Sequence, residues 1–447
     1  MFNESSKGLK KGRMDWSLLF AAFTLLLMGT LAIVSSTVSL PMHDRILRIH
    51  FTAIPLAAAM FLFGWSFNYQ IYQDQWKVVY GVVLAALVGV LLFGVTDRGS
   101  KSWFRLPFFS IQPAELCRIG LILVFANYLD KNSARIREPL VALKALALTM
   151  PVFFLVMKQP DFSSTLVTFP VMIAMLFCAG ANIFHLLVIL GYGFLAGFFP
   201  IAWTFISLNP DWLDSSRVLQ AFYALSKFGL PTLYFCVGVA AFAYGFKWLA
   251  GKLRWRLPKI YFIGGALVII LGFLSGVWVQ NQLKEYQRKR FEVFLSPEAD
   301  PQGAGYNLLQ AQVAIGSGGL LGKGVFSGTQ TRLGFVPERH TDFILAVVGE
   351  ETGFWGTGLV LGLYLLMLWR IRQAAQLARD QYGYLVACGL FSMFTIYLMI
   401  NFGMSVGIMP VAGIPLPLLS YGGSNLVSTL WAVGIAESIY ARRMALV

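Results

Sequence analysis

The sequence predicts an all-α polytopic membrane protein, a bundle of transmembrane helices. Apolar residues make up 57% of the 447 residues and charged residues only 13%, whereas soluble domains are about half apolar and a quarter charged. Many windows reach the length of a membrane-spanning helix, which requires about 20 predominantly apolar residues. Basic clusters recur between these windows, as they do in proteins that cross the membrane repeatedly.

Twelve apolar windows are predicted to cross the membrane. They lie at 16–36, 51–67, 77–96, 114–130, 139–157, 163–181, 183–204, 231–250, 258–278, 350–371, 383–404 and 425–441. The first window is full length and no small-residue cleavage site follows a short core, so no cleavable signal peptide is expected.

Basic clusters predict the orientation of the chain. Lys7, Lys10, Lys11 and Arg13 precede the first window, and the positive-inside rule places them in the cytoplasm. If the chain crosses the membrane at each window, four later basic clusters also lie on the cytoplasmic side. They are at 131–137, 252–256, 370–379 and 442–443. Both termini are therefore expected in the cytoplasm, and the polar segment at 279–341 is expected outside it.

The net charge and the cysteines exclude several classes of function. The formal charge of +14 comes mostly from the inside loops, so it does not indicate nucleic-acid binding. Cys117, Cys178, Cys236 and Cys388 all lie in apolar windows, where cysteine behaves as a small hydrophobic residue. Their spacing indicates neither a metal site nor a disulfide framework.

Two of the predicted outside loops carry bases against the positive-inside rule. Residues 97–105 include Arg98, Lys101 and Arg105, and residues 43–48 include Arg45 and Arg48. A polyanionic ligand at the outer surface would explain these bases. The alternative is that both loops contact lipid headgroups.

Ionisable residues near the membrane segments are candidates for function. Glu115 and Arg118 are three residues apart, so a helix would place them on one face. They form either a structural ion pair or part of a polar cavity that receives substrate. Asp161, in the short Lys-Gln-Pro-Asp interruption, is expected to cap the following helix.

Two further segments have a sequence that is unusual for a membrane-spanning region. The segment at 407–425 is too rich in Pro and Gly for a regular helix, and broken backbone at membrane depth is tolerated only against protein or a watery cavity. Glu350 and Glu351 begin a predicted span, where acids suit the helix dipole.

The polar segment at 279–341 combines bases, few acids and eight glycines between residues 303 and 328. Glycines allow a backbone to turn sharply or to approach a ligand closely. The stretch 307–316 has helical spacing, which predicts a short surface helix. Asp300 precedes Pro301, and on that ground alone it is expected to be a turn residue rather than a catalytic one.

Several motifs occur in the order that the SEDS family of peptidoglycan glycosyltransferases shows, the family of FtsW and RodA. They are GSKSWF (99–104), IQPAE (111–115), KQPD (158–161), DPQGAGYNLLQAQVAIGSGG (300–319), PERHTDFI (337–344) and PLPLLSYGGS (415–424). The chain thus resembles this family over 15–200 and 279–441. GKGVFSGTQ (322–330) and GIPLP (413–417) are more similar to the RodA branch, which acts in cell elongation, than to the FtsW division branch.

The resemblance implies polymerisation of lipid II into β-1,4-linked glycan strands outside the membrane, with Asp300 as general base. It also implies a bacterial cell-membrane location and a class B penicillin-binding protein as transpeptidase partner. The expected substrate-binding residues are Lys101, Arg105, Glu115, Arg118, Lys323, Arg339 and Ser420. The family usually has Lys at the position of Arg118. No cofactor is evident, and a divalent cation that assists the pyrophosphate remains open.

The chain departs from the family's ten spans by two, which predicts an insertion at 205–278 within one integral membrane domain. Two other functions share the expected topology and ligand. A lipid II flippase would have inverted repeats and charges through the full membrane depth, whereas the polar residues here concentrate at the outer face. A non-catalytic scaffold for the penicillin-binding protein is the other alternative.

Overall fold

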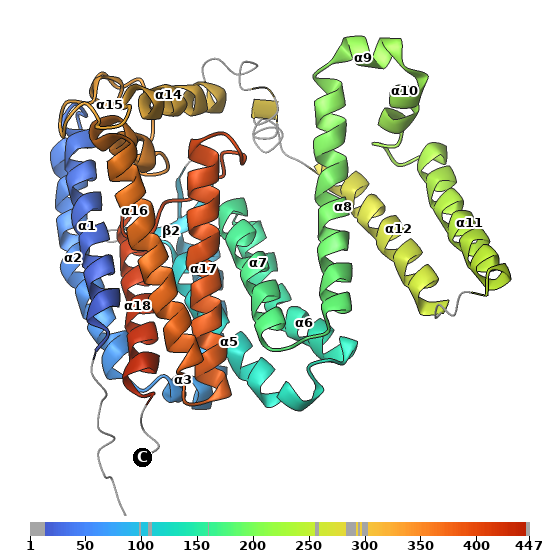
Figure 1. The fold of residues 1–447 in the computed structure, drawn as a ribbon, viewed down its shortest axis with the longest axis horizontal. Helices are drawn as coiled ribbons and strands as arrows, with labels where there is room; N and C mark the ends of the chain where they lie inside the picture. The colour runs from blue at the N-terminus through green and yellow to red at the C-terminus, as the bar shows by residue number, and fades with distance from the viewer. Residues whose placement is uncertain are drawn as a thin grey trace, which may run out of the picture. The chain divides into compact units, whose positions relative to one another are not determined.

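The computed structural model describes residues 14–97, 100–105, 110–159, 161–254, 259–282, 292–293, 296 and 303–443. These residues fold mainly as α-helices, many of them long and straight (Figure 1). The chain divides into two compact units, one formed by 1–181 with 307–447 and the other by 182–306.

The first unit contains the helices of both chain ends. They are α1 (Trp16–Thr37), α2 (His43–Ser66), α3 (Gln70–Asp74), α4 (Trp76–Phe93), α5 (Pro113–Lys131), η1 (Ser133–Arg135), α6 (Pro139–Lys158), α7 (Phe162–Cys178), α14 (Ala304–Ser317), α15 (Thr329–Arg332), α16 (Ile344–Gln376), α17 (Gln381–Ser405) and α18 (Gly423–Ala441). Helix α17 packs against α5, α7 and α16, and 72% of its most apolar window is buried. It is therefore the central helix of this unit. Helix α14 lies across one end of the upright helices (Figure 1).

A small antiparallel sheet follows α4, where the sequence predicts an outside loop. It comprises β1 (Val95–Asp97), β2 (Ser100–Arg105) and β3 (Ser110–Ile111), in the order β1-β2-β3. Thr96 is paired with Lys101, and Arg105 with Ser110. The sheet thus gives two of the predicted ligand-binding bases a defined backbone position.

The second unit comprises α8 (Ile183–Ser207), α9 (Pro210–Ser215), α10 (Arg217–Ala224), α11 (Leu230–Lys252) and α12 (Lys259–Gln282). Its core is aromatic: Phe199, Trp203 and Phe273 are buried against one another. The Trp203 indole N–H donates to the Phe222 carbonyl at 3.0 Å, so α10 is tied to α8. Helices α11 and α12 supply the two spans predicted within 205–278.

Each of the twelve predicted spans overlaps a helix, although the end of the window 77–96 reaches into β1. Nine helices among the described residues are long and apolar enough to cross a membrane. The other three spans correspond to α5, α7 and α18. Helix α5 has several charged residues, α7 has only 17 residues, and α18 is rich in Ser, Thr and Asn. The number of spans therefore stays a prediction, as does the cytoplasmic location of both termini.

The starts of two helices differ by six or more residues from the sequence prediction. Helix α2 begins at His43 and not at 51, so Arg45 and Arg48 lie in its first turns and not in a loop. Their charges hid the helix because only its later turns are apolar. Helix α16 begins at Ile344 rather than 350, which moves Glu350 and Glu351 out of its first turn.

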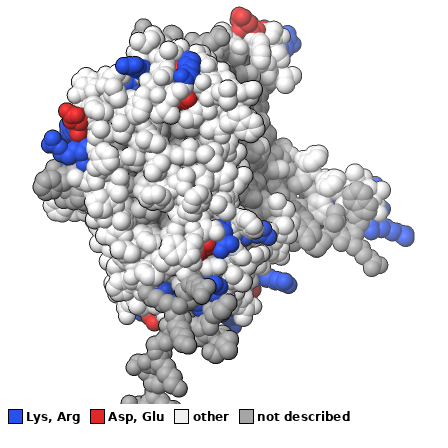
Figure 2. Space-filling view, turned by 60° about the vertical axis from the view of Figure 1, so that its left-hand side comes forward, with Lys and Arg blue, Asp and Glu red and all other residues white. Residues whose placement is uncertain are grey.

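The charged side chains of one face lie mainly toward its two ends. Figure 2 shows Lys, Arg, Asp and Glu gathered there over the helices of the first unit, with an uncharged band between them. Many large apolar side chains of these helices are exposed, including Phe20, Phe23, Val82 and Leu92. Such a band matches the hydrocarbon core of a bilayer, and the chain is an integral membrane protein.

Candidate functional site

A buried polar cluster begins where β3 leads into α5. The Gln112 backbone N–H donates to Ser424 Oγ at 2.8 Å, and the Gln112 side-chain amide donates to Asp161 Oδ2 at 2.6 Å. Ser424 Oγ in turn donates to the Ser110 carbonyl at 3.0 Å. Gln112 therefore joins the starts of three helices, α5, α7 and α18. Pro113 occupies the first position of α5, where its missing N–H leaves no bond unmade.

Asp161 caps α7, as the sequence predicts. Its Oδ1 accepts from the Ser164 backbone N–H at 3.1 Å, and its Oδ2 accepts from the Ser164 hydroxyl at 2.6 Å. The side chain is 9% exposed. The capping role is confirmed, and Asp161 also belongs to the polar cluster through Gln112.

Arg118 lies one turn below Glu115 on α5, and both side chains are buried. Arg118 Nε donates to Thr168 Oγ1 at 3.2 Å, and its Nη1 donates to the Tyr397 hydroxyl. The guanidinium also lies over the Tyr397 ring, 5.1 Å from its centre. Neutral groups of α7 and α17 thus hold this cation.

Glu115 does not form the direct ion pair with Arg118 that one reading of the sequence proposes. Within the described residues, its Oε2 has no hydrogen-bond partner, and no ion pair joins Glu115 to Arg118. Buried polar atoms without a partner call for an explanation such as a water or a ligand. The arrangement therefore favours a polar cavity over a structural ion pair.

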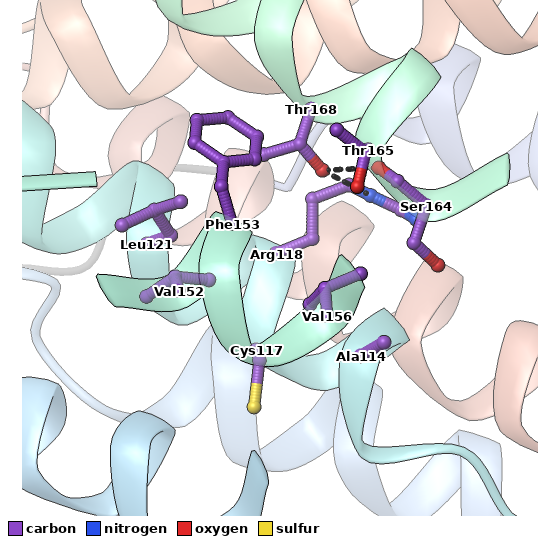
Figure 3. A pocket seen from close by; sticks show the side chains of 10 residues that line it. All are labelled: Ala114, Cys117, Arg118, Leu121, Val152, Phe153, Val156, Ser164, Thr165 and Thr168. Atoms are coloured by element: carbon purple, nitrogen blue, oxygen red, sulfur yellow. Dashed lines mark hydrogen bonds between the residues drawn. The ribbon is translucent and has the colours of Figure 1, made fainter. Parts of the chain in front are cut away.

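A pocket opens beside Arg118 between α5, α6 and α7. It is narrow, with room for about one water-sized molecule. Figure 3 shows the Arg118 side chain extended toward Thr165 and Thr168, with Val152, Phe153 and Val156 of α6 on the opposite wall. Thr165 Oγ1 is buried and has no partner among the described residues. One wall of the pocket is thus polar and the other apolar.

Lys323 lies in the glycine-rich loop and is bound to α16. Its ammonium donates to Glu350 Oε1 at 2.9 Å, and to the hydroxyl oxygens of Ser317 and Thr329 at 2.8 Å each. A lysine ammonium has three N–H donors, and these contacts use all of them. In this structure Lys323 positions the loop, and its predicted contact with substrate stays a prediction.

Glu350 is fully buried and serves as the anchor of that loop. Besides Lys323, its carboxylate accepts from the backbone N–H groups of Gln330 and Thr331, at 2.8 and 2.9 Å. These N–H groups belong to the first turn of α15. The sequence predicts that Glu350 stabilises the start of its own helix, and this is wrong: it caps a different helix, α15.

Helix α16 is broken at Gly353, whose φ of 65° and ψ of −159° are not helical. The break frees the carbonyls of Glu350 and Glu351, which accept from Lys323 N and Gly324 N at 3.0 Å each. A Cβ on Gly353 would lie 2.3 Å from the Gly322 nitrogen. The glycines at these positions therefore let the loop approach α16 itself.

Arg339 is 3% exposed and is turned toward α1. Its Nε donates to the Ser36 carbonyl at 2.7 Å and its Nη2 donates to Ser39 Oγ at 2.7 Å. Burial lowers the pKa of the Arg339 guanidinium. Arg339 thus fastens the segment before α16 to the end of α1, and its role toward substrate stays a prediction.

Ser420 closes a tight turn in the segment 407–422, which is irregular as predicted. Its hydroxyl oxygen accepts from the Leu416 backbone N–H at 2.8 Å, and the residue is 5% exposed. The Asn401 amide of α17 donates to the Ile414 carbonyl of this segment at 2.8 Å. Broken backbone is satisfied here by protein groups, as membrane burial requires.

The remaining predicted site residues lie at the sheet or outside the described residues. Lys101 Nζ donates to the Leu92 carbonyl at 3.0 Å and is partly exposed, while Arg105 at the end of β2 is exposed. Asp300, the predicted base, lies outside the described residues. Within the described residues no three His, Cys, Asp or Glu side chains meet as a metal ion would require.

Sequence reasoning did not identify Thr168, Tyr397 or Gln112, although these residues hold the cluster together. Tyr397 is 279 residues from Arg118 in the chain. A hydroxyl in an apolar helix gives a weak signal by itself. The available clue is that a buried arginine must find acceptors on the helices around it.

The fold and this cluster define a polytopic membrane protein with buried charged and polar side chains where α5, α7 and α18 begin. The chain belongs to the family of FtsW, RodA and SpoVE, described as cell cycle proteins, whose family model matches residues 15–226 and 236–444.

Relatives with assigned names support this family. The chain is 33% identical over 441 residues to peptidoglycan glycosyltransferase RodA of Treponema pallidum, with 96% of this chain and 98% of that protein covered. It is 32% identical over 377 residues to peptidoglycan glycosyltransferase MrdB of Escherichia coli, with 84% and 80% covered. The predicted family and enzyme class, peptidoglycan glycosyltransferase, are confirmed. Whether 205–278 is an insertion stays a prediction.

Solved structures resemble this chain over nearly its whole length. One is a structure of a peptidoglycan synthase complex that describes the coordination of polymerization and crosslinking. Its chain has a TM-score of 0.66 to this protein at 26% identity, with 96% of this chain and 98% of that chain covered. The rod shape determining protein RodA of Thermus thermophilus has a TM-score of 0.57 at 23% identity, with 97% and 98% covered. The predicted fold class is confirmed.

Proposed function

We propose that this protein polymerises lipid II into β-1,4-linked glycan strands for cell elongation, at the extracytoplasmic face of the bacterial cell membrane. The buried polar cluster of α5 and α7 carries the proposal. Charged groups at membrane depth are costly and mark functional sites. Glu115 Oε2 and Thr165 Oγ1 lack partners within the described residues, so the cluster has polar atoms to offer to a ligand.

The lining of the pocket combines a cation with an apolar wall, which suits contact with one part of an amphiphilic substrate such as lipid II. Arg118 is a fixed cation whose planar guanidinium matches phosphate oxygens. The apolar wall formed by Val152, Phe153 and Val156 would contact the lipid part. The exposed Arg105 and the partly exposed Lys101 would add positive charge for the pyrophosphate.

The proposed chemistry is an inverting glycosyl transfer with Asp300 as general base. Asp300 takes the proton from the 4-hydroxyl of the acceptor GlcNAc, and that oxygen attacks the anomeric carbon of the lipid-linked MurNAc. The bond to the pyrophosphate breaks, and the undecaprenyl pyrophosphate leaves with its charge balanced by cations. One base and a stabilised leaving group suffice for such a step.

The test is polymerisation of purified lipid II by the full chain in detergent or vesicles, with strand length measured on gels. Asp300→Ala is expected to abolish polymer formation, since general-base catalysis contributes about 10²–10⁴-fold. Glu298→Ala is the matched control, because it removes a neighbouring acid from the same segment, and it should retain activity.

Other results would assign other functions. Equal polymer from wild type and Asp300→Ala would refute the base assignment. Movement of labelled lipid II across vesicles without polymer would identify a flippase, and polymer formed only by an added partner would identify a scaffold.

We also propose a class B penicillin-binding protein as partner, which co-purification tests. The structure of a peptidoglycan synthase complex that this chain resembles supports it.

A further inference from the structure

A tight turn after α14, from Gly318 to Gly322, presents two leucines to the surface. The Gly322 backbone N–H closes the turn by donating to the Gly318 carbonyl at 2.8 Å. Gly319 and Gly322 have φ of 57° and 77°, in the left-handed region that favours glycine. Between them, Leu320 and Leu321 are 66% and 83% exposed. The turn thus holds two large apolar side chains away from the protein core.

The chain runs along α16 into this turn and then runs back. Cβ atoms on the two end glycines of the turn would lie 2.0 and 2.2 Å from the carbonyl oxygens of Gly349 and Glu351. At the tip, the Trp355 backbone N–H donates to the Leu320 carbonyl at 3.3 Å. The tip of the turn therefore lies about one helical turn further along α16 than its two ends.

The tip adjoins an exposed apolar face of α16. Phe354, whose backbone N–H also donates to the turn, is exposed, and so are Leu361, Leu365 and Trp369. Residues at intervals of seven, four and four lie on one face of a helix. In an integral membrane protein, acyl chains cover such a face. Leu320 therefore lies beside a face of α16 that contacts lipid.

Two contacts between α1 and α16 mark levels in the membrane. At one end Asp15 forms an ion pair with Arg370, at 2.5 Å. At the other end the Ser35 hydroxyl donates to Glu351 Oε1. Helix α1 covers about 30 Å between Asp15 and Ser35, at about 1.5 Å per residue. The hydrocarbon core of a bilayer is about 30 Å thick, so the two contacts belong at its opposite boundaries.

The tip of the turn lies inside this core. Trp355 follows Glu351 in the direction of Arg370 by about one helical turn, which is about 5 Å. Because Leu320 is hydrogen-bonded to Trp355, the two leucines lie at that depth and not above the level of Glu351. Backbone within hydrocarbon must be satisfied by protein, and this turn is hydrogen-bonded to α16. Acyl chains, rather than a partner in water, are therefore in reach of Leu321.

We propose that Leu320 and Leu321 insert among the phospholipid acyl chains of the adjacent leaflet and anchor the glycine-rich loop to the membrane. Acyl chains fit these side chains because both are apolar and neither forms hydrogen bonds. The chain is polar again at Lys323, whose ammonium binds Glu350 at the boundary of the hydrocarbon core. The inserted leucines and this ion pair together hold the loop at a fixed depth.

The test measures membrane depth with the full chain in phospholipid vesicles, after its four cysteines are replaced by alanine. A nitroxide is attached to Leu321→Cys, and electron paramagnetic resonance gives its collision rates with oxygen and with a nickel chelate. Leu361→Cys is the lipid reference, and Arg332→Cys, an exposed base of the same loop, is the water reference. The oxygen-to-nickel ratio at position 321 should exceed that at 332 by about threefold or more, because hydrocarbon excludes the polar chelate. Equal ratios at 321 and 332 would overturn the proposal.

Photocrosslinking in cell membranes identifies what contacts the leucines. Leu321→p-benzoylphenylalanine is expected to give phospholipid adducts by mass spectrometry, and the same change at Arg332 should give none. Leu321 is largely exposed, so its replacement should leave the fold intact. An adduct with a second copy of the chain or with another protein, or the lack of a phospholipid adduct, would overturn the proposal. Neither readout involves glycan synthesis, so both stand apart from the proposed function.

Discussion

The ion pair between Lys323 and Glu350 offers the sharpest test of how the glycine-rich loop is held. The Glu350 carboxylate is fully buried, whereas the Lys323 side chain is 27% exposed. Exposed ion pairs contribute about 0–1 kcal/mol, and loss of one partner of a buried pair costs about 3–5 kcal/mol. Since the lysine remains partly hydrated, we expect a coupling free energy of about 2 kcal/mol between these limits.

A double-mutant cycle of Lys323→Met, Glu350→Gln and the double variant measures this coupling. Hydrogen exchange is read at the backbone amides of Lys323, Gly324, Gln330 and Thr331, whose acceptors lie on α16. A coupling of about 2 kcal/mol corresponds to about a 30-fold change in local opening, since 1.4 kcal/mol is tenfold.

Glu350→Gln should also have the larger single effect, because it weakens the cap of α15 as well as the ion pair. A lost helix cap costs about 0.5–2 kcal/mol. Amides on α17 serve as an internal control and should exchange at the same rate in all four proteins. Effects of the two substitutions that add to within about 0.5 kcal/mol would show independent sites. That outcome would refute the assignment of Lys323 as a loop-positioning residue.

Three further substitutions test the packing of the cluster and the bundle. Tyr397→Phe removes the hydroxyl that accepts a hydrogen bond from Arg118 and keeps the ring. Loss of one hydrogen bond worth about 1.4 kcal/mol should lower the rate of glycan synthesis about tenfold. Unchanged activity would contradict this role. Asp161→Ala should lower the melting temperature in detergent, because a cap worth about 1 kcal/mol is lost; an unchanged temperature would exclude it. Gly29→Ala places a Cβ 2.6 Å from the Leu419 backbone and should cost about 1–3 kcal/mol. Gly81→Ala, with nothing within 4 Å, is the matched control, and equal melting of the two variants would count against the close contact.

The helices could be predicted from the sequence because their signal is local. A run of about 20 apolar residues is sufficient to indicate a spanning helix, and each predicted window overlaps a helix. The start of α2 was not predictable in this way because Arg45 and Arg48 interrupt the apolar pattern. The break in α16 was not predictable for the opposite reason. Gly353 lies inside an apolar window, and hydropathy does not indicate its positive φ.

The candidate site was predictable only in its charged members. Glu115 and Arg118 stand out because charges are rare in spanning helices, and the capping role of Asp161 follows from its place before α7. The acceptors of Arg118 come from two other helices, and Tyr397 is 279 residues away in the chain. No periodicity relates such positions, so only the packing of α5, α7 and α17 brings them together.

The glycine-rich loop changes most between sequence and structure, and the change bears on where a ligand's charge is met. The sequence predicts that Lys323 contacts substrate and that the glycines allow close approach to a ligand. In the structure, Gly322 and Gly353 allow the loop to approach α16, and Lys323 forms the ion pair with Glu350. Arg339 is likewise committed to α1. Under the proposed function, we therefore expect Arg118 in the pocket and the bases of β2 to meet the charge of the pyrophosphate. The loop itself is held on α16 through Glu350.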